Sequence, residues 1–257
     1  MEKSILVLTD FVGSGDVAMA AARAVLTRLG HRVICLPTAL ISNTWNLGTV
    51  AQMDTTDYMK AALETWQRLG LPLDGVLLGY VADDRQAQWL GERCREWHRA
   101  GVTIFLDPIF ADNGQLYRGI TQERVELLRT LLPRVDYVLP NRTEAAFLTG
   151  AEEPMEALHR LTALGAGTAL ITGASWEGTA AVLLAQGSRT RVLPYSPIPG
   201  HFPGAGDVFT ALFAGHILAG KDPAASAQAA MDTTALWISQ SLCSPHAAIG
   251  LPVERYF

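Results

Sequence analysis

The sequence predicts an α/β fold with a mostly parallel central sheet, and three observations support this prediction. Short apolar segments alternate with longer stretches of helical composition along the chain. The apolar segments do not alternate with polar residues, which is typical of strands covered by helices on both faces. Four helical stretches end at a glycine, and an apolar segment follows within a few residues. Repeated units of this kind form parallel sheets with right-handed crossovers.

The expected elements of the first half of the chain follow from these signals. Strands are predicted at Ile5–Thr9, Arg32–Pro37, Gly75–Leu78 and Thr103–Leu106. Helices are predicted at Asp16–Leu29 and Asp54–Leu69. The second helix has its apolar residues at helical spacing, which predicts one buried stripe: Tyr58, Ala61, Ala62, Thr65, Trp66 and Leu69. The glycines expected to end helices are Gly30, Gly70, Gly101 and Gly165.

The second half continues the pattern and adds a hairpin. Strands are predicted at Tyr137–Leu139 and Thr168–Thr172, and an antiparallel hairpin at Ala180–Leu184 and Thr190–Tyr195. Two helices are expected at the end of the chain, Asp207–Ala219 and Pro223–Ser241. Because the sequence has no low-complexity linker and no shift in composition, we expect one domain over residues 1–257.

Composition excludes several classes of protein. The chain has 257 residues, of which 49% are hydrophobic and 18% charged, as expected for a globular protein. The net charge is −5 and there is no run of Lys or Arg, so we expect no nucleic-acid partner. Cys35, Cys94 and Cys243 are far apart, as in a cytoplasmic protein with reduced thiols. No apolar run approaches the ~20 residues that span a bilayer, and no signal peptide is found, so we expect no membrane partner.

The sharpest motif is Pro203-Gly204-Ala205-Gly206-Asp207, which directly precedes an apolar helical stretch. Glycines let the backbone approach a ligand closely, and the unpaired N–H groups at a helix start bind anions. At such a site Asp207 can accept a proton from a substrate hydroxyl while the backbone holds phosphoryl oxygens. The alternative is a glycine turn in which Asp207 only caps the helix.

Two further motifs place carboxylates after predicted strands. In Asn141-Arg-Thr-Glu144, the glutamate could hold Mg²⁺ through water, or Asn141 could simply cap the next helix. In Asp107-Pro-Ile-Phe-Ala-Asp112-Asn-Gly114, the two aspartates could serve Mg²⁺ and ATP phosphates, or only form a turn. The residues alone leave these alternatives open.

Other motifs argue against rival functions. The segment from Gly13 to Ala18 matches the dinucleotide-binding pattern G-x-G-x-x-A, but the next strand does not end in the acidic residue that binds the ribose. The sequence contains no Walker A motif, no G-x-S-x-G and no zinc-binding histidine pair. His98 and His159 are expected at the surface, and His201 is expected to pack in a loop near the anion site.

Together and in this order, the motifs resemble the ribokinase-like superfamily, and within it the pyridoxal (vitamin B6) kinases. The resemblance runs along the whole chain. It is carried by the segments Ile5–Asp10, Thr38–Asn43, Gly79-Tyr80, Asp107–Tyr117, Leu139–Glu144, Thr172, Gly204–Asp207 and Glu254–Phe257.

This resemblance implies a three-layer α/β/α sandwich, usually a homodimer, that uses ATP with Mg²⁺ and often K⁺. Asp207 matches the catalytic base of the family, and Gly204, Ala205 and Gly206 match its anion hole. Positions around ATP and Mg²⁺ are matched by Asp112, Asn141, Glu144 and Thr172, and Asp107 joins Glu144 and Asp112 as a candidate metal residue. Thr38 and Tyr80 match positions that line the vitamin pocket.

The chain departs from the family mainly on the substrate side. Asp10 replaces a serine that touches the pyridine ring, and Ala18-Met19, Thr44-Trp45 and Thr172-Gly173 replace other family residues. We therefore expect an ATP-dependent kinase that phosphorylates a hydroxymethyl group, with Asp10 among its substrate-binding residues. The 5′-hydroxymethyl of pyridoxal, pyridoxine or pyridoxamine is the leading substrate. The alternatives are a hydroxymethylpyrimidine or sugar kinase of the same superfamily and a catalytically idle, ligand-binding relative.

Overall fold

The computed structural model describes residues 2–200, 202–242, 244 and 247–256. The chain divides into two compact units, one formed by Met1–Ala82 with Ile198–Phe257 and the other by Asp83–Pro197. His201, Cys243 and Phe257, which the sequence analysis considers, lie outside the described residues. None of the helices in the described part of the chain combines the length and apolar composition that a bilayer crossing requires.

The first unit contains a four-stranded sheet. Its strands are β1 (Ser4–Val12), β2 (Arg32–Ile41), β3 (Gln52–Asp54) and β4 (Gly75–Leu78), in the order β4-β1-β2-β3. β1 pairs in parallel with β2 and β4, and β3 is antiparallel to β2. The central strand β1 is buried from Ser4 to Asp10, which explains why its sequence is apolar without alternation.

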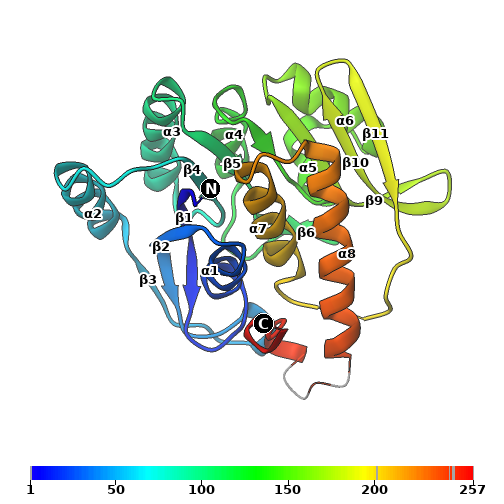
Figure 1. Ribbon diagram of the computed structural model, residues 1–257, viewed down its shortest axis with the longest axis horizontal. Helices are drawn as coiled ribbons and strands as arrows, with labels where there is room; N and C mark the ends of the chain where they lie inside the picture. Colours follow the sequence, from blue (N-terminus) through cyan, green and yellow to red (C-terminus); the bar gives the residue numbers. More distant parts are fainter. Residues whose placement is uncertain (1, 201, 243, 245–246, 257) are drawn as a thin grey trace. The chain divides into compact units, whose positions relative to one another are not determined.

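The helices of the first unit are α1 (Ala18–Arg28), α2 (Thr56–Arg68), α7 (Ala205–Leu218) and α8 (Pro223–Ser241), with short 3₁₀ turns η1 (Trp45–Leu47), η3 (Ala247–Ile249) and η4 (Val253–Tyr256). α7 packs between α1 and α8, so the last part of the chain rests against the first (Figure 1). α7 is apolar on most of its surface because it is buried on several sides. α1 also packs on β1 and β2, and this fixes both ends of the chain to one sheet.

The second unit contains a five-stranded sheet in the order β11-β10-β9-β8-β5. Its strands are β5 (Thr103–Leu106), β8 (Tyr137–Val138), β9 (Thr168–Trp176), β10 (Thr179–Gln186) and β11 (Arg189–Pro194). β5, β8 and β9 are parallel, and β9, β10 and β11 are antiparallel neighbours. A separate small hairpin is formed by β6 (Ala111–Asp112) and β7 (Gln115–Leu116).

The helices of the second unit are α3 (Asp84–Arg99), α4 (Gln122–Arg129), α5 (Arg142–Thr149) and α6 (Pro154–Ala163), with a 3₁₀ turn η2 (Leu132–Arg134). α5 packs against α6, β6 and β9. The start of α5 therefore lies beside the small hairpin and the end of a parallel strand. The carboxyl ends of parallel strands are where α/β folds bind ligands.

Most predicted elements are present, with shifted bounds. All four glycines expected to end helices have positive φ, between 63° at Gly70 and 106° at Gly165. Of the predicted apolar stripe of α2, Ala62 is buried, but Tyr58 and Leu69 are exposed and the other buried residues of the helix are Thr56 and Met59, so most of the stripe is wrong. Of the described cysteines, Cys94 is buried, Cys35 is half-buried and both are free. His98 and His159 are exposed, as predicted.

Candidate active site

The glycine motif starts α7 in a way that only glycine allows. Gly204 is the N-cap residue and has a φ of 79°, in the left-handed region. A Cβ at this position would lie 3.0 Å from the carbonyl oxygen of Asp16 and from the Val17 side chain. Both the backbone conformation and the close approach to α1 therefore exclude larger residues.

Asp207 occupies the third position of α7, so the alternative that it caps this helix is wrong. Its side chain leaves its own helix, and Oδ2 accepts a 2.8 Å hydrogen bond from the backbone N–H of Ala18, the first residue of α1. Ala18 itself has a positive φ of 49°. The contact fixes one carboxylate oxygen of Asp207 and joins two helix starts, a pairing that no sequence pattern indicated.

The predicted anion hole is only partly open. The N–H of Ala205 donates to the carbonyl oxygen of Phe202, while α7 has no side-chain cap. Gly206 is exposed, and a Cβ on it would meet no atom within 4 Å. Open space at the start of a helix is what an anion needs, because the helix dipole and the first N–H groups favour negative charge there. Gly206 thus fits the predicted role better than Ala205.

The three predicted substrate residues belong to one hydrogen-bonded group. Thr38 Oγ1 donates to the carbonyl oxygen of Tyr80 over 2.7 Å, and the N–H of Tyr80 donates to Thr9 Oγ1 over 3.2 Å. Thr9 Oγ1 in turn donates to Asp10 Oδ1 over 3.1 Å. Thr9 was missed by sequence reasoning, although its position next to Asp10 on a buried strand was a usable signal.

Asp10 lies inside β1, two residues before its end, and not at the strand end that the sequence predicted. The register between β1 and β2 shifts between Thr9 and Phe11, so Asp10 sits at a β-bulge, a feature common next to active sites. Its side chain is 9% exposed, and burial raises its pKa from 3.8 to about 6, although the Thr9 hydroxyl opposes the shift. Asp10 does not cap the turn that follows through Gly13, since the N–H of Gly13 donates to the carbonyl oxygen of Ile41.

An apolar cluster lies around the start of α1. It comprises Val12, Val17, Ala18, Ala39 and Ile41, with Val50, Tyr80 and Ala82 packed against it. Val12 and Ile41 are paired across β1 and β2, so they share one sheet face. Because this cluster includes Ala18, whose N–H donates to Asp207, buried apolar side chains pack next to the candidate base.

In the second unit, Asn141 and Glu144 form a complete capping box at the start of α5. Asn141 Oδ1 accepts from the N–H of Glu144, and Glu144 Oε2 accepts from the N–H of Asn141, both at 2.9 Å. The predicted helix cap is therefore present. Asn141 also donates to the carbonyl oxygen of Ala111 over 2.7 Å, which ties the cap to the small hairpin.

Glu144 also holds the loop before that hairpin. Its Oε1 accepts from the N–H groups of Phe110 at 2.9 Å and Ala111 at 3.4 Å. The side chain is 2% exposed, and burial raises its pKa from 4.5 to about 7, against the effect of these backbone hydrogen bonds. Ile109, just before Phe110, has a φ of 40°, which is rare for a β-branched residue and is the kind of strain that clusters at functional sites.

Asp112 lies at the tip of the small hairpin, where Asn113 and Gly114 form the turn with positive φ. Its two oxygens accept from the backbone and side-chain N–H groups of Asn113. Gly114 in turn donates to Thr143 Oγ1 on α5 over 3.0 Å, a contact that the sequence did not indicate. Asp107 is half-buried at the end of β5. The turn-forming role of Asp112 is thus real, and it leaves the carboxylate half-exposed.

A cavity of about 800 Å³ brings three of the four predicted ATP residues together. It is lined by Asp112, Asn141 and Thr172, with Gly114, Thr143, Phe147 and Gly173 among the other lining residues. Thr172 lies on β9, where its N–H donates to Pro140, directly before Asn141. Glu144 does not line the cavity and stands behind it.

The acidic residues here fit Mg²⁺ only as a partly hydrated ion. Within the described residues, no group of three or more metal-binding side chains forms a ready cage. Mg²⁺ usually takes one or two carboxylates, several waters and the phosphates of its nucleotide, so such a cage is not required. Asp112 offers a half-exposed carboxylate at the cavity, whose two oxygens accept from Asn113. Glu144, by contrast, is buried, and both of its oxygens accept backbone hydrogen bonds.

The dinucleotide-like glycines have a packing role. A Cβ on Gly15 would lie 2.8 Å from the Thr44 side chain and 3.1 Å from the carbonyl oxygen of Ile249. Close packing of the loop thus explains why this position is a glycine.

Comparison with known proteins now decides the family. The sequence pattern of the phosphomethylpyrimidine kinases matches residues 22–250. The chain belongs to this family. A pyridoxine/pyridoxal/pyridoxamine kinase of Bordetella avium is 29% identical over 245 residues, which cover 89% of this chain and 80% of that protein.

Solved structures share the fold of this chain. Pyridoxal kinase from Lactobacillus plantarum is 27% identical with a TM-score of 0.90, covering 99% of this chain and 95% of its own. Pyridoxal kinase from Leishmania donovani, solved with ADP and pyridoxamine, is 24% identical with a TM-score of 0.86, covering 99% and 94%. These similarities confirm the predicted fold class, the ribokinase-like three-layer α/β/α sandwich with a mostly parallel central sheet.

Proposed function

We propose that this protein transfers the γ-phosphate of ATP to a hydroxymethyl group, most favourably the 5′-hydroxymethyl of pyridoxal, pyridoxine or pyridoxamine. Membership of the phosphomethylpyrimidine kinases and the similarity to pyridoxal kinases support the reaction class. The observation that carries the proposal is the start of α7, where the Asp207 carboxylate is held by Ala18 next to the open space at Gly206.

In this reaction Asp207 accepts the proton of the substrate hydroxyl as its oxygen attacks the γ-phosphorus. The bond from that phosphorus to the bridging oxygen breaks, and ADP leaves. One oxygen of Asp207 is fixed by the Ala18 N–H, so the carboxylate is oriented before the substrate arrives. The start of α7, with Gly206 at its second position, stabilises the negative charge on the transferred group.

We propose the cavity at Asp112, Asn141 and Thr172 as the ATP site. Mg²⁺ would neutralise phosphate charge there, with Asp112 as its nearest protein carboxylate and Asp107 and Glu144 as further candidates. Glu144 positions the Phe110–Ala111 backbone and the start of α5 at the edge of this cavity. A requirement for K⁺ is a further expectation of the family resemblance.

On the substrate side we propose Asp10, Thr38 and Tyr80 as binding residues. The hydrogen bonds through Thr9 hold the backbone of Tyr80 against Asp10 and Thr38, next to the apolar cluster at Val12 and Ala39. A flat ring would bind beside this apolar cluster while its polar groups meet Asp10. Catalysis also requires a base, and α7 supplies one in Asp207, which is held by the N–H of Ala18. The alternative of a catalytically idle, ligand-binding relative therefore has less support.

Hydroxymethylpyrimidine is the second candidate substrate. The name of the matched family favours it. Asp10 favours it as well, because a carboxylate accepts hydrogen bonds from a ring amino group, which an aminopyrimidine carries.

A coupled ADP-release assay over pyridoxal, pyridoxine, pyridoxamine, hydroxymethylpyrimidine and simple sugars tests the proposal. We expect the highest kcat/KM with one of the B6 vitamers and no turnover of sugars. Turnover of hydroxymethylpyrimidine alone would select the second candidate. If none of these substrates caused release of ADP at saturating ATP and Mg²⁺, the proposed reaction would be contradicted.

We further propose that residues 1–257 act as a single kinase domain, because the family pattern runs through both compact units. The same resemblance supports a homodimer in the cytoplasm. Size-exclusion chromatography with light scattering tests the oligomeric state, and fractionation of the native cell tests the location.

A further inference from the structure

Two glycines that lie far apart in the sequence approach the backbone of Asp16. Gly204 approaches it from the start of α7, and Gly250 approaches it from the last part of the chain. A Cβ on Gly250 would lie 2.5 Å from the carbonyl oxygen of Asp16 and 2.6 Å from its carbonyl carbon. Gly250 is buried and has a φ of 139°, which favours glycine. Because backbone atoms cannot rotate aside as the end of a side chain can, a larger residue at 250 must move the peptide of Asp16.

The residue before Gly250 is hydrogen-bonded to the same backbone. The N–H of Asp16 donates to the carbonyl oxygen of Ile249 over 2.9 Å, and Asp16 and Gly250 form an isolated parallel β-bridge. A Cβ on Gly15 would lie 3.1 Å from that Ile249 carbonyl oxygen. Residues 249 and 250 therefore hold the loop that leads directly into α1.

Residues 248–256, which we name the C-terminal segment, are anchored in the first unit. The side chains of Leu251 and Val253 are buried. The ring of Tyr256 stacks on Trp237 of α8 with 5.8 Å between the ring centroids, and its hydroxyl shares a hydrogen bond with Ser241. The segment is thus held by contacts that do not involve the loop before α1.

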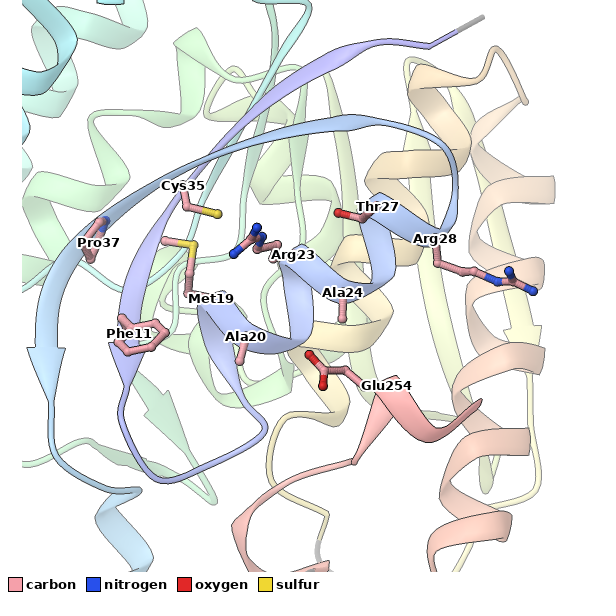
Figure 2. A pocket seen from close by; sticks show the side chains of 10 residues that line it. All are labelled: Phe11, Met19, Ala20, Arg23, Ala24, Thr27, Arg28, Cys35, Pro37 and Glu254. Atoms are coloured by element: carbon pink, nitrogen blue, oxygen red, sulfur yellow. The ribbon is translucent and has the colours of Figure 1, made fainter. Parts of the chain in front are cut away.

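The C-terminal segment also lies beside α1. Figure 2 shows Glu254 of η4 next to Ala20 and Ala24 on the first turns of that helix, and all three residues line one groove. η4 packs against α1 as well. The segment therefore meets both the first turns of α1 and the loop that precedes them.

We propose that Gly250 is a positioning residue for the base Asp207 and acts through the backbone of Asp16. Two positions after Asp16, the N–H of Ala18 donates to Asp207 Oδ2 over 2.8 Å. Ala18 has a φ of 49°, a conformation that persists in a residue other than glycine only when the surrounding structure holds it. A displaced Asp16 peptide moves the Ala18 N–H away from Oδ2, so that the carboxylate no longer faces the substrate hydroxyl correctly. This inference rests on the proposed function, because it concerns the base of the proposed phosphoryl transfer.

Gly250→Ala tests the inference in the full chain. Misplacement of a reacting group costs about 10²-fold in rate, so we expect kcat to fall by about that factor. KM for ATP should stay close to the wild-type value, because the proposed ATP cavity belongs to the second unit. Gly220→Ala is the matched control: Gly220 has a φ of 91°, and a Cβ there would meet no atom of the described residues within 4 Å. Equal kcat values in the two variants would overturn the inference.

The amide resonance of Ala18 in ¹⁵N-labelled protein gives a readout that needs no turnover. An N–H that donates to a carboxylate resonates downfield, and Asp207→Ala, which removes the acceptor, provides the reference position. In Gly250→Ala the resonance should move toward this reference. A wild-type resonance position in the folded variant would overturn the inference, whatever its kcat. A wild-type enzyme that releases no ADP would instead contradict the proposed function, while the resonance still tests the contact.

If Gly250→Ala yields no folded protein, Tyr256→Ala decides. It removes the ring that anchors the C-terminal segment on Trp237 and leaves Gly250 in place. We expect a smaller loss of kcat and a shift of the Ala18 resonance in the same direction. Tyr58→Ala is its control, since Tyr58 on α2 is 57% exposed. A Tyr256→Ala variant with the kcat and the Ala18 resonance of the wild type would overturn the inference.

Discussion

In the described part of the chain, α5, α6 and α7 each carry an acidic residue three positions after the N-cap, and α5 and α7 use it in opposite ways. In α5, Glu144 folds back on its own helix and completes a capping box with Asn141. In α7, Asp207 leaves its own helix start without a side-chain cap and accepts instead from the first N–H of α1.

The difference follows from the N-cap residue. Asn141 has a side chain that satisfies one amide of its helix and an extended backbone, whereas Gly204 has no side chain and a positive φ. When the N–H groups at a helix start are satisfied by side chains of the same helix, the start has a structural role. A helix start without a side-chain cap can instead bind the anionic group of a ligand. The comparison teaches that an acidic residue near a helix start is informative only together with the residue at the cap.

The strongest test of this contrast is Asp207→Asn. The amide oxygen of asparagine can still accept from the Ala18 N–H, so the fold and ATP binding should stay nearly intact. Loss of the base should lower kcat by about 10²–10⁴-fold. Steady-state kinetics with the preferred substrate, together with the melting temperature, check this. A variant that kept more than about a tenth of the activity would contradict the role of Asp207 as base.

Gly206→Ala probes the open side of the same helix. A Cβ here meets no protein atom within 4 Å, so the melting temperature should not fall. The methyl group would occupy the space proposed for the transferred phosphate, where weakened stabilisation of an anion costs on the order of 10²-fold in kcat. Gly173→Ala is not a suitable control, because the positive φ of Gly173 would strain an alanine. Ala219→Gly is the control: it exchanges the same two residue types in the opposite direction, at the C-cap of α7 and outside the site. Unchanged kcat in Gly206→Ala would remove Gly206 from the anion site.

Glu144→Gln should affect stability first. Both carboxylate oxygens accept backbone hydrogen bonds, and a glutamine would turn its NH₂ group toward one set of donors. Leaving buried donors unsatisfied costs about 1–3 kcal/mol in the free energy of unfolding. If Glu144 also acts through the water shell of Mg²⁺, the Mg²⁺ concentration for half-maximal rate should rise more than KM for the organic substrate.

Asp112→Asn is the matched comparison, because Asp112 is half-exposed and lines the cavity. It should raise the Mg²⁺ requirement with little loss of stability. An unchanged Mg²⁺ dependence in Glu144→Gln would restrict Glu144 to its structural role.

Asp10 should make stability fall as pH rises. Its pKa is raised from 3.8 to about 6, so the folded state favours the neutral form. The stabilisation is complete below pH ~4 and is lost as the pH passes through about 6, a change of roughly 2–3 kcal/mol. Asp10→Asn cannot titrate, so urea unfolding should show the variant gaining stability relative to wild type between pH 4 and pH 8. A difference that does not vary with pH would rule out this titration.

The smallest expected effect is on the choice of substrate. Asp10→Ser replaces a carboxylate with a neutral hydroxyl, which should shift the ranking in kcat/KM toward pyridoxal and away from substrates rich in hydrogen-bond donors. Assays with pyridoxal, pyridoxamine and hydroxymethylpyrimidine on both proteins check this. The same factor for all three substrates would mean that Asp10 does not select among them.

The sequence predicted those elements of the fold that depend on neighbouring residues along the chain. The strands Gly75–Leu78 and Thr103–Leu106 and the glycine helix ends were predictable because each depends on a few neighbouring residues. The buried face of α2 was predicted wrongly: periodicity gives a stripe, but only tertiary packing decides that Met59 faces inward and Tyr58 outward.

For the site, the residue types and their places at strand and helix ends were predictable. Their contacts were not. The hydrogen bond between Asp207 and Ala18 joins residues 189 positions apart, and the register shift at Asp10 exists only in the pairing of β1 with β2. The signals of Asn141 and Glu144 supported both a cap and a metal site, and geometry was needed to establish the cap.

The long span between Asp207 and Ala18 has a consequence during synthesis on the ribosome. The first unit is discontinuous, and α7, which covers α1, is translated after the whole second unit. At about 5–20 residues per second, the ribosome needs roughly 10–40 s to extend the chain from Ala18 to Asp207. During this time the surface of α1 that packs on α7 in the folded protein has no cover from α7. A nascent chain stalled before residue 198 should therefore depend on chaperones more than one stalled after α8.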